Sequence, residues 1–412
     1  MRKILVLSPS DIFPPVDGNS ENIYHIVKHL APNNVLGVLL SRVFSQRGSP
    51  DISDPKLTIR YCPASAFDRL QYKSFLVNPY YYEAANRLMR DVDADIIQCQ
   101  VLFTFLVGYF LKRRYGKPLV LVQENAEYVK QVKFEAPGYA TATLKWLERT
   151  ACRAADKIVA VSEVDKSHMV DLYGIPEEKV HVINHCADEK VFVYDADGAA
   201  EVRRALGIGA DDLVLTYVGK MDAPHNTVAT QYIAERIYPR VLEKHPNSWF
   251  MIIGQKYEHL LEYQRERLFF TGFVSSHKEA SPNLADHLSA SDIIIVPMDR
   301  GSGTRLKILE AAACSRPIVS TEIGAEGLEF TAGEEILLTR EVDNSFIELV
   351  LGLMADPAWR DRLGTQARKR LLERYSWEKE VSKFEEVYRG LEAASGTSGG
   401  SGPDCPEPDG RA

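Results

Sequence analysis

Short apolar runs alternate with helix-like stretches along most of this chain, and this alternation restricts the possible folds more than any other feature. The runs are apolar on both faces, which is typical of parallel strands covered by helices on either side. A first series comprises KILVLS (3–8), VLGVLL (35–40), DIIQCQ (95–100), PLVLVQ (118–123) and KIVAVS (157–162). After Gly207 a second series comprises LVLTYVG (213–219), WFMIIG (249–254), LFFTGF (268–273), DIIIVP (292–297) and PIVSTE (317–322).

The two series predict an α/β protein built from two Rossmann-like domains with parallel sheets. We expect an N-terminal domain over residues 1–190, a polar linker over 191–212 and a second domain over 213–373. Residues 374–394 are expected to form a helix that crosses back to the first domain. Residues 395–412 are rich in Gly, Ser and Pro, with almost no apolar residues, and we expect them to be disordered.

Charge and cysteine usage exclude several classes of protein. The net charge of −8 disfavours nucleic acid as a partner. The six cysteines form no C-x-x-C pair, so neither a zinc site nor a disulfide framework is indicated, and a cytoplasmic location is expected. The longest apolar stretch, residues 101–111, is too short for a membrane span. The basic run at residues 111–117 leaves open a weak peripheral contact with a membrane surface.

The most informative loop is GSGTRLKILEAAA, which follows the apolar run DIIIVP. Two glycines precede a helix that we expect to begin near Thr304, and backbone N–H groups at a helix N-terminus favour an anion. Arginine binds phosphate as a fork and lysine as a point charge. The acid Glu310 could accept the hydroxyls of a ribose, or could form an ordinary surface pair with Lys307. The predicted donor-binding residues of this loop are Gly301, Ser302, Gly303, Thr304, Arg305, Lys307 and Glu310.

A second loop follows the first strand, where Asp17-Gly18-Asn19 precedes another expected helix. Gly18 there either allows a close approach to a ligand or belongs to a plain turn and cap. The loop lacks the G-x-G-x-x-G pattern, which counts against a dinucleotide-dependent dehydrogenase.

Three stretches resemble GT-B fold retaining glycosyltransferases of family 4, also described as glycosyl transferases group 1. They are GSGTRLKILEAAACSRPIVSTEIGAEGLEF (301–330), the stretch from Tyr217 to Gly254, and LERTACRAADKIVAVSEVD (147–165) followed by VHVINHCADEKVF. The resemblance implies two Rossmann-like domains whose parallel sheets face each other across a cleft. It also implies a nucleotide-diphosphate sugar as donor substrate, without a further cofactor.

The resemblance also implies roles for individual residues. Glu310 matches the family's ribose-binding glutamate, and Gly303, Thr304 and Arg305 match its phosphate-contacting loop. Lys220 matches a basic position that faces the diphosphate, and Gly18 matches the glycine that faces it from the first domain. Arg305 is predicted to act in catalysis by stabilising the leaving phosphates.

The chain departs from the family pattern at three places. The first glutamate of E-x7-E is replaced by Ser302, and Asn226 stands where a second lysine is common. Where the family often has a histidine after the strand 118–123, this chain has Gln123, Glu124 and Asn125. Glu124 and Glu127 are therefore the catalytic candidates in the first domain, with burial or capping as the alternative roles, and Glu124 is the one assigned to catalysis.

The predicted function is transfer of a sugar from a nucleotide-diphosphate sugar to a hydroxyl of a glycan, a lipid-linked acceptor or a small molecule. An NAD-dependent oxidoreductase, a sugar-nucleotide epimerase of GT-B form and a non-catalytic nucleotide-sugar-binding protein are the alternatives. No metal site is predicted. The D-x-D pattern within residues 91–95 precedes a strand, at the end away from the expected crevice.

Overall fold

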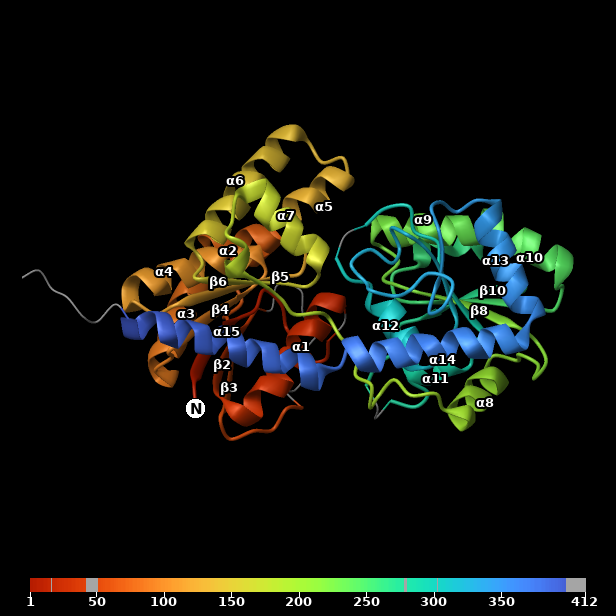
Figure 1. Cartoon of the computed structure of the whole chain (residues 1–412), viewed down its shortest axis with the longest axis horizontal. Coiled ribbons are helices and arrows are strands. Elements are labelled where there is room, and N and C mark those ends of the chain that lie inside the picture. The colour runs from red at the N-terminus through yellow and green to blue at the C-terminus, as the bar shows by residue number, and fades with distance from the viewer. Residues whose placement is uncertain (16, 42–50, 278–279, 302, 398–412) are drawn as a thin grey trace, which may run out of the picture.

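The two series of apolar runs fold into two separate parallel sheets, which lie in the two halves of an elongated molecule (Figure 1). The computed structural model describes residues 1–15, 17–41, 51–277, 280–301 and 303–397. The predicted residue Ser302 and most of the predicted tail (398–412) lie outside the described residues. The chain has the α/β, GT-B arrangement expected from its sequence.

The first sheet has seven strands in the order β3-β2-β1-β4-β5-β6-β7, and every neighbouring pair is parallel. Its strands are β1 (Lys3–Leu7), β2 (Val35–Leu40), β3 (Leu57–Tyr61), β4 (Ile96–Gln100), β5 (Leu119–Gln123), β6 (Lys157–Ala160) and β7 (Val180–Val182). The central strands β4 and β5 are buried along their whole length, as strands covered on both faces must be.

The second sheet has six strands in the order β10-β9-β8-β11-β12-β13, again all parallel. Its strands are β8 (Val214–Val218), β9 (Trp249–Ile253), β10 (Leu268–Gly272), β11 (Ile293–Val296), β12 (Ile318–Thr321) and β13 (Leu337–Thr339). Each sheet therefore begins at its centre, extends to one edge and then restarts on the other side of its first strand.

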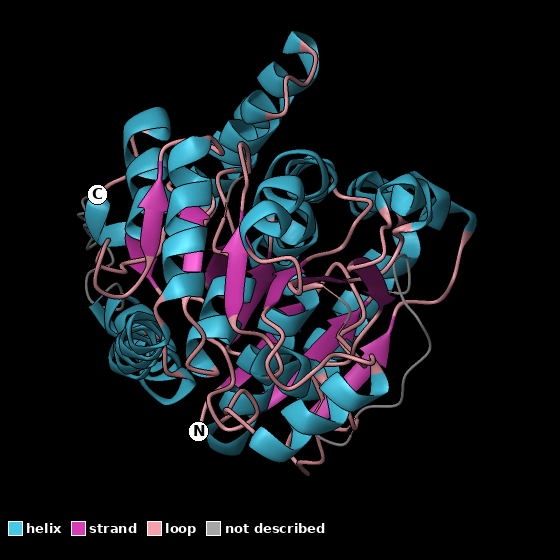
Figure 2. Ribbon diagram, turned by 90° about the vertical axis from the view of Figure 1, so that its right-hand side faces the viewer, coloured by secondary structure: helices cyan, strands magenta, loops and turns pink. Residues whose placement is uncertain are grey.

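Helices connect the parallel strands and cover both sheets, so the strands are sandwiched between helical layers (Figure 2). In the first half these helices are α1 (Gly18–Leu30), α2 (Ser74–Val77), α3 (Pro79–Val92), α4 (Phe105–Tyr115), α5 (Glu127–Lys133), α6 (Gly138–Ala154) and α7 (Glu163–Tyr173). The second half contains α8 (Ala196–Ala205), α9 (Pro224–Tyr232), α10 (Tyr238–Lys244), α11 (Leu284–Ser289), α12 (Leu306–Ala313), α13 (Asn344–Ala355) and α14 (Pro357–Arg374). None of the helices in the described ranges has both the length and the apolar content needed to cross a bilayer.

The chain passes between the two halves twice. Residues 191–212, treated above as linker, include α8, which packs on α11 of the second half. The last helix, α15 (Trp377–Thr397), leaves the second half after α14 and packs against α1 of the first (Figure 1). Tyr388 on α15 donates a hydrogen bond to Gln98 of β4 at 2.5 Å, and Arg2 bonds both Glu385 and Glu392. The helix ends at Thr397, whereas the tail was predicted to begin at residue 395.

The strand order identifies where a ligand can bind. In a doubly wound sheet the crevice opens at the carboxyl ends of the strands, where the order reverses. The reversal lies between β1 and β4 in the first sheet, and between β8 and β11 in the second. The segments after β1, β8 and β11 lead to Gly18 at the start of α1, to Lys220 and to the glycine loop.

Candidate functional site

The glycine loop after β11 leads into α12 later than the sequence indicated. The helix begins at Leu306 and not near Thr304, because Arg305 takes an extended conformation and occupies the N-cap position. The Arg305 side chain is buried, and its Nη1 donates to the Gly303 carbonyl at 2.6 Å. A Cβ at position 301 would lie only 2.2 Å from Arg305 Nη2, so the glycine there makes room for the guanidinium. Arg305 thus holds the shape of the loop from within.

Lys307 lies one residue into α12 and is bonded to the second sheet. Its ammonium donates to the Tyr217 hydroxyl at 3.0 Å and to Asn226 Oδ1 at 3.1 Å, and lies 4.2 Å from the centroid of the Tyr217 ring. Tyr217 in turn donates to Asn226 Oδ1 at 2.6 Å. Burial lowers the pKa of Lys307 to about 7, helped by the nearby charge of Arg305 and opposed by Glu310. The ammonium therefore reaches the side chain that replaces the family's second lysine.

Glu310 lies one turn further along α12 and is partly buried. Burial raises its pKa to about 8, and the negative charge of Glu21 on α1 adds to this rise, whereas Lys307 opposes it. Because the Lys307 ammonium bonds Tyr217 and Asn226, the two side chains do not behave as the ordinary solvated surface pair considered above. A carboxyl group held in this way is a ready acceptor for ligand hydroxyls once it is ionised.

The remaining predicted residues surround this helix. Lys220 follows β8 and is partly buried, and its carbonyl accepts a bond from Asn226 Nδ2 at 2.9 Å. Gly18 is the first residue of α1, and Asp17 caps that helix in a capping box with Ser20. A Cβ on Gly18 would lie 3.4 Å from Leu306 Cδ1 of the second half. The capping role considered for this loop is therefore present, and Gly18 also lies close to a side chain of the second half.

Glu124 follows β5, on the first-sheet side of the same junction. Asn22 on α1 donates to Glu124 Oε1 at 3.4 Å, and the Asn19 amide, turned to donate, lies 2.8 Å from the same oxygen. Burial raises the pKa of Glu124 to about 8, against the lowering effect of the Asn22 hydrogen bond. The Glu124 carbonyl oxygen would lie 3.0 Å from a Cβ at Gly303, which has a φ of +76°. Glu124 thus lies next to the glycine loop.

Some residues at this junction were not predicted from the sequence. Tyr217 is hidden within a strand run, and Glu21 and Asn22 are ordinary-looking helix residues; only the packing of the two halves gives them a place here. His225 on α9 was also missed. Its Nδ1 is buried and has no hydrogen-bond partner among the described residues. Burial lowers its pKa to about 3, and the charges of Lys307, Arg305 and Lys130 add to the effect.

The two halves are closed on each other at this site. Lys133 of α5 bonds Glu326 of the second half at 2.7 Å, and Ser276 donates to Glu21 at 3.3 Å. A small cavity nearby is lined by residues of both halves, which include Ser162 and Gly327.

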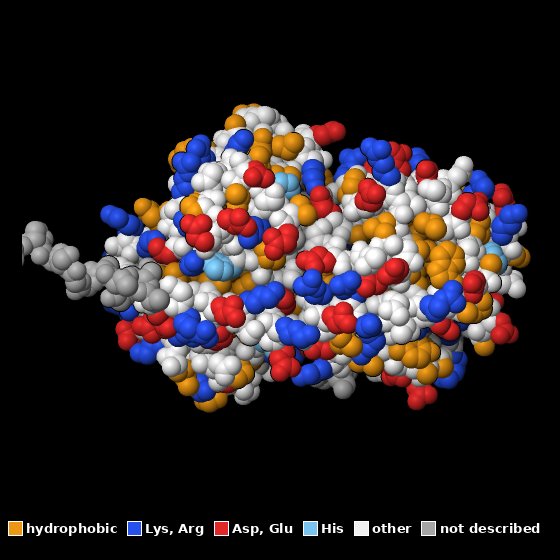
Figure 3. All heavy atoms as spheres, viewed as in Figure 1, with side chains coloured by type: hydrophobic (Ala, Val, Ile, Leu, Met, Phe, Trp, Pro, Cys, Tyr) orange, Lys and Arg blue, Asp and Glu red, His pale blue; other side chains and the backbone are white. Residues whose placement is uncertain are grey.

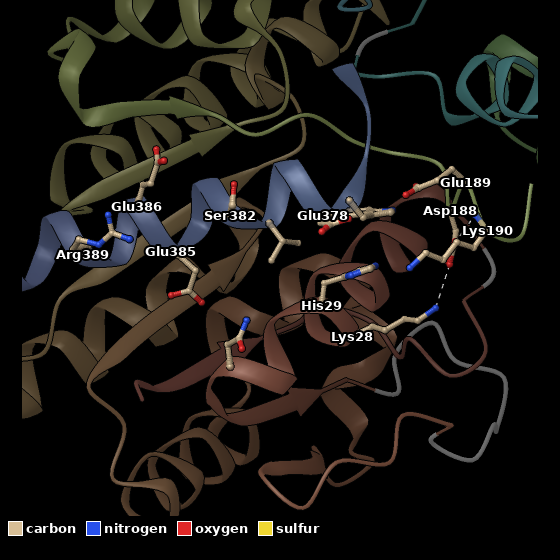
Figure 4. Close-up of a pocket in the computed structure, with 13 residues that line it drawn as sticks. Lys28, His29, Asp188, Glu189, Lys190, Glu378, Ser382, Glu385, Glu386 and Arg389 are labelled. Carbon is tan, nitrogen blue, oxygen red and sulfur yellow. Dashed lines mark hydrogen bonds and ion pairs between the residues drawn. The ribbon is translucent and has the colours of Figure 1, made fainter. Parts of the chain in front are cut away.

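A much larger cavity, of about 550 Å³, lies between α1 and α15 (Figure 4). It is lined by Lys28 and His29 at the C-terminal end of α1, by Asp188–Lys190 and by α15. A helix of this length is about 20 Å long, so the cavity is far from Gly18 at the other end of α1. Size alone does not make it the candidate site, because the crevice predicted from strand order lies elsewhere.

The aspartates of the D-x-D pattern have partners that give them a structural role. Asp93 bonds Lys3 at 2.9 Å and Asp95 bonds Lys117 at 3.3 Å. Both lie before β4, at the end of the sheet opposite the crevice. Among the described residues no group of three or more His, Cys, Asp or Glu side chains could hold a metal ion.

Comparison with known proteins agrees with this geometry. Residues 212–356 match the family model of glycosyl transferases group 1, and residues 23–191 match the model of glycosyltransferase family 4. The two matches together cover well over half of the chain. The fold and these matches define a GT-B glycosyltransferase, and the chain belongs to glycosyltransferase family 4.

Individual relatives have low sequence identity to this chain, but the similarity extends over most of its length. The chain is 24% identical to alpha-maltose-1-phosphate synthase of Mycolicibacterium smegmatis, over 73% of this chain and 80% of the relative. Sucrose-phosphate synthase from Thermosynechococcus elongatus superposes with a TM-score of 0.78 at 20% identity, covering 95% of this chain and all of that structure. Anabaena HepE in complex with UDP-glucose superposes with a TM-score of 0.71 at 13% identity, covering 94% and 99%.

Proposed function

We propose that this glycosyltransferase takes its sugar from a nucleoside-diphosphate sugar and transfers it to an acceptor hydroxyl with retention at the anomeric carbon. The observation that carries the proposal is that both Lys307 and Glu310 lie on α12, the helix that follows the glycine loop at the switch point of the second sheet. The first residue offers charge to a diphosphate and the second offers oxygen acceptors to a ribose. The complex of HepE with UDP-glucose supports this choice of donor.

In the proposed reaction the bond between the anomeric carbon and the diphosphate breaks while the acceptor oxygen forms a new bond to that carbon. Negative charge develops on the departing phosphates, and Lys220, Lys307 and the N-terminus of α12 stabilise it. Arg305 supports this arrangement by holding the loop carbonyl. The departing phosphate accepts the acceptor's proton, so the reaction uses no pair of carboxylates and proceeds without metal or further cofactor. The acceptor is a glycan, a lipid-linked molecule or a small-molecule hydroxyl, and the reaction takes place in the cytoplasm.

A thermal-shift screen of nucleoside diphosphates and their sugars tests the donor. A ligand at a hundred times its dissociation constant should add about 2.7 kcal/mol to the free energy of unfolding. Chromatographic separation and mass analysis of products, with and without acceptor and in excess EDTA, then separate transfer from epimerisation. Epimerisation needs no acceptor and gives a product of unchanged mass but different retention. If no nucleoside diphosphate or nucleotide sugar shifts the melting temperature, the proposed donor is wrong.

A further inference from the structure

The hairpin of α5 and α6 projects from the body of the first half. Both ribbon views show its far end as the part of the molecule that stands out most from the sheets (Figures 1 and 2). Its inner face packs on the first half, since Thr141, Glu148, Ala151 and Cys152 of α6 are buried. Its outer face presents exposed aromatic and basic side chains.

Two aromatic side chains on the outer face are unusually exposed. Tyr139 is 80% exposed and Trp146 is 67% exposed. They are seven residues apart on α6, which places them two turns apart on the same side of the helix. Val132 at the end of α5 is also exposed. Large exposed side chains are usually scattered singly, whereas these share one hairpin.

The surface charge of the hairpin is opposite to that of the whole chain. Residues 127–154 contain five basic side chains and three acidic ones, and two of the acids, Glu127 and Glu148, are buried. Glu135 is then the one acid on the hairpin surface. Arg149 and Arg153 follow Trp146 at three and seven residues, on the aromatic side of α6. The chain as a whole carries a net charge of −8.

We propose that the outer face of the α5–α6 hairpin docks on the surface of an anionic lipid bilayer. Tryptophan and tyrosine rings occupy the interface between headgroups and acyl chains, and arginine binds lipid phosphates. Figure 3 shows hydrophobic and basic side chains together along this projecting part. The same arrangement disfavours a dimer that pairs hairpin with hairpin, because like charges would then meet.

The hairpin is better placed for this role than the basic run at residues 111–117. In that run Lys112 bonds Asp156 at 2.7 Å and Lys117 bonds Asp95. In the hairpin Lys130 and Lys133 are paired with Glu127 and Glu326, but among the described residues Lys145, Arg149 and Arg153 of α6 form no ion pair. The hairpin also follows directly after Glu124, and the pair of Lys133 with Glu326 joins it to the second half. A membrane in contact with the hairpin therefore lies beside the candidate site. This position of the membrane favours a membrane-bound acceptor, an inference that rests on the proposed function.

Sedimentation with vesicles tests the docking surface on the full chain without any substrate. Vesicles of phosphatidylglycerol and phosphatidylcholine are compared with vesicles of phosphatidylcholine alone, at low and high salt. The variants are the double change Tyr139→Ser with Trp146→Ser, and the charge reversal Arg149→Glu. The matched control is Tyr80→Ser, which removes an exposed tyrosine from α3 in the same half.

Wild type and the control should bind the anionic vesicles, and binding should weaken with salt. The affinity of the aromatic double variant for these vesicles should be lower than that of wild type by about tenfold or more, and the affinity of Arg149→Glu should also be lower. Equal binding by wild type and both variants would overturn the proposal, as would failure of wild type to bind. Sedimentation of wild type as a dimer that the aromatic variant abolishes would also overturn it, in favour of a second copy. Thermal shifts with UDP test the donor site separately. A failure of the proposed function can therefore be distinguished from a failure of the docking proposal.

Discussion

Glu310 is the residue on which the donor assignment depends most. Two hydrogen bonds from a ribose to a charged group each contribute roughly 1.5–3 kcal/mol. Glu310→Ala should therefore weaken binding of a nucleoside diphosphate by about 100-fold, and Glu310→Gln by less. Because the pKa of Glu310 is raised to about 8, its carboxylate is fully present only above that pH. The ratio of dissociation constants, variant to wild type, should be larger at pH 9 than at pH 7 by calorimetric titration. Equal constants in equally folded proteins would remove the ribose role.

The bonds of Lys307 to Asn226 suggest that this lysine replaces the family's missing second cation. Lys307→Met should weaken diphosphate binding by about tenfold or more, since it removes a charged partner. Adding Asn226→Lys to Lys307→Met should restore part of the affinity, because a lysine at 226 can occupy the space left by the ammonium. Lys307→Arg is the control that keeps the charge. Affinities that are unchanged in Lys307→Met, measured by titration with UDP, would contradict a role in diphosphate binding.

Burial of Glu124 predicts a dependence of stability on pH. Its pKa in the folded protein is about 8, against a usual value of 4.5, so between these values the folded state binds a proton that the unfolded state lacks. The wild-type free energy of unfolding should therefore fall as the pH rises from about 4.5 to 8. Glu124→Gln does not titrate and should escape this loss. Its melting temperature, relative to wild type, should rise between pH 5 and pH 9. A difference that stays constant with pH would show that the carboxyl is not held protonated.

At the scale of elements, the sequence predicted the central strands well because apolar runs on both faces are a strong signal. It missed β3, β7 and β13, which are all edge strands of their sheets. β3 alternates between half-buried and exposed positions, and β7 and β13 have only three residues each, so none forms an apolar run. The start of α12 was predicted two residues early, because the bond from Arg305 to the loop carbonyl is visible only in three dimensions. Glu21 and Tyr217 were missed at the candidate site because their positions there also depend on three-dimensional packing.

The two ends of α15 should respond differently to truncation. Three large side chains of α15, Trp377, Phe384 and Tyr388, are almost completely buried. Losing even one buried aromatic side chain costs about 3–5 kcal/mol, which is much of the stability of an ordinary domain. A chain that ends at Tyr375 should therefore lose its cooperative thermal transition. A chain that ends at Thr397 should melt at the wild-type temperature, since the composition of residues 398–412 lacks apolar side chains for a core. A lower melting temperature for the second truncation would show that those residues stabilise the fold.

At the scale of the whole molecule, the contacts between the two halves describe a closed state. The bond from Lys133 to Glu326 and the approach of Gly303 to Glu124 join the halves beside the candidate site. The chain crosses between the halves at two places, near residue 190 and before α15. Such an arrangement allows the halves to separate at the cleft while they stay joined at the crossings. Donor binding and domain opening should therefore be coupled.

A disulfide across the junction would test this coupling. A Cβ at Gly327 would lie 3.1 Å from the Ser162 Cβ, a few tenths of an ångström below the range of about 3.5–4.5 Å found in disulfides. Gly327 has a φ of +81°, so a cysteine there is strained in both redox states. The double variant Ser162→Cys with Gly327→Cys should form this disulfide bond on oxidation. The five described native cysteines are all buried, so they should not compete for it. Oxidation should weaken binding of UDP by at least about tenfold, and reduction of the same sample should restore it. The reduced protein is the matched control, since it carries the same loss of the Ser162 cap on α7. Equal dissociation constants in the two redox states, with the bond confirmed by mass, would mean that the donor enters without this junction opening.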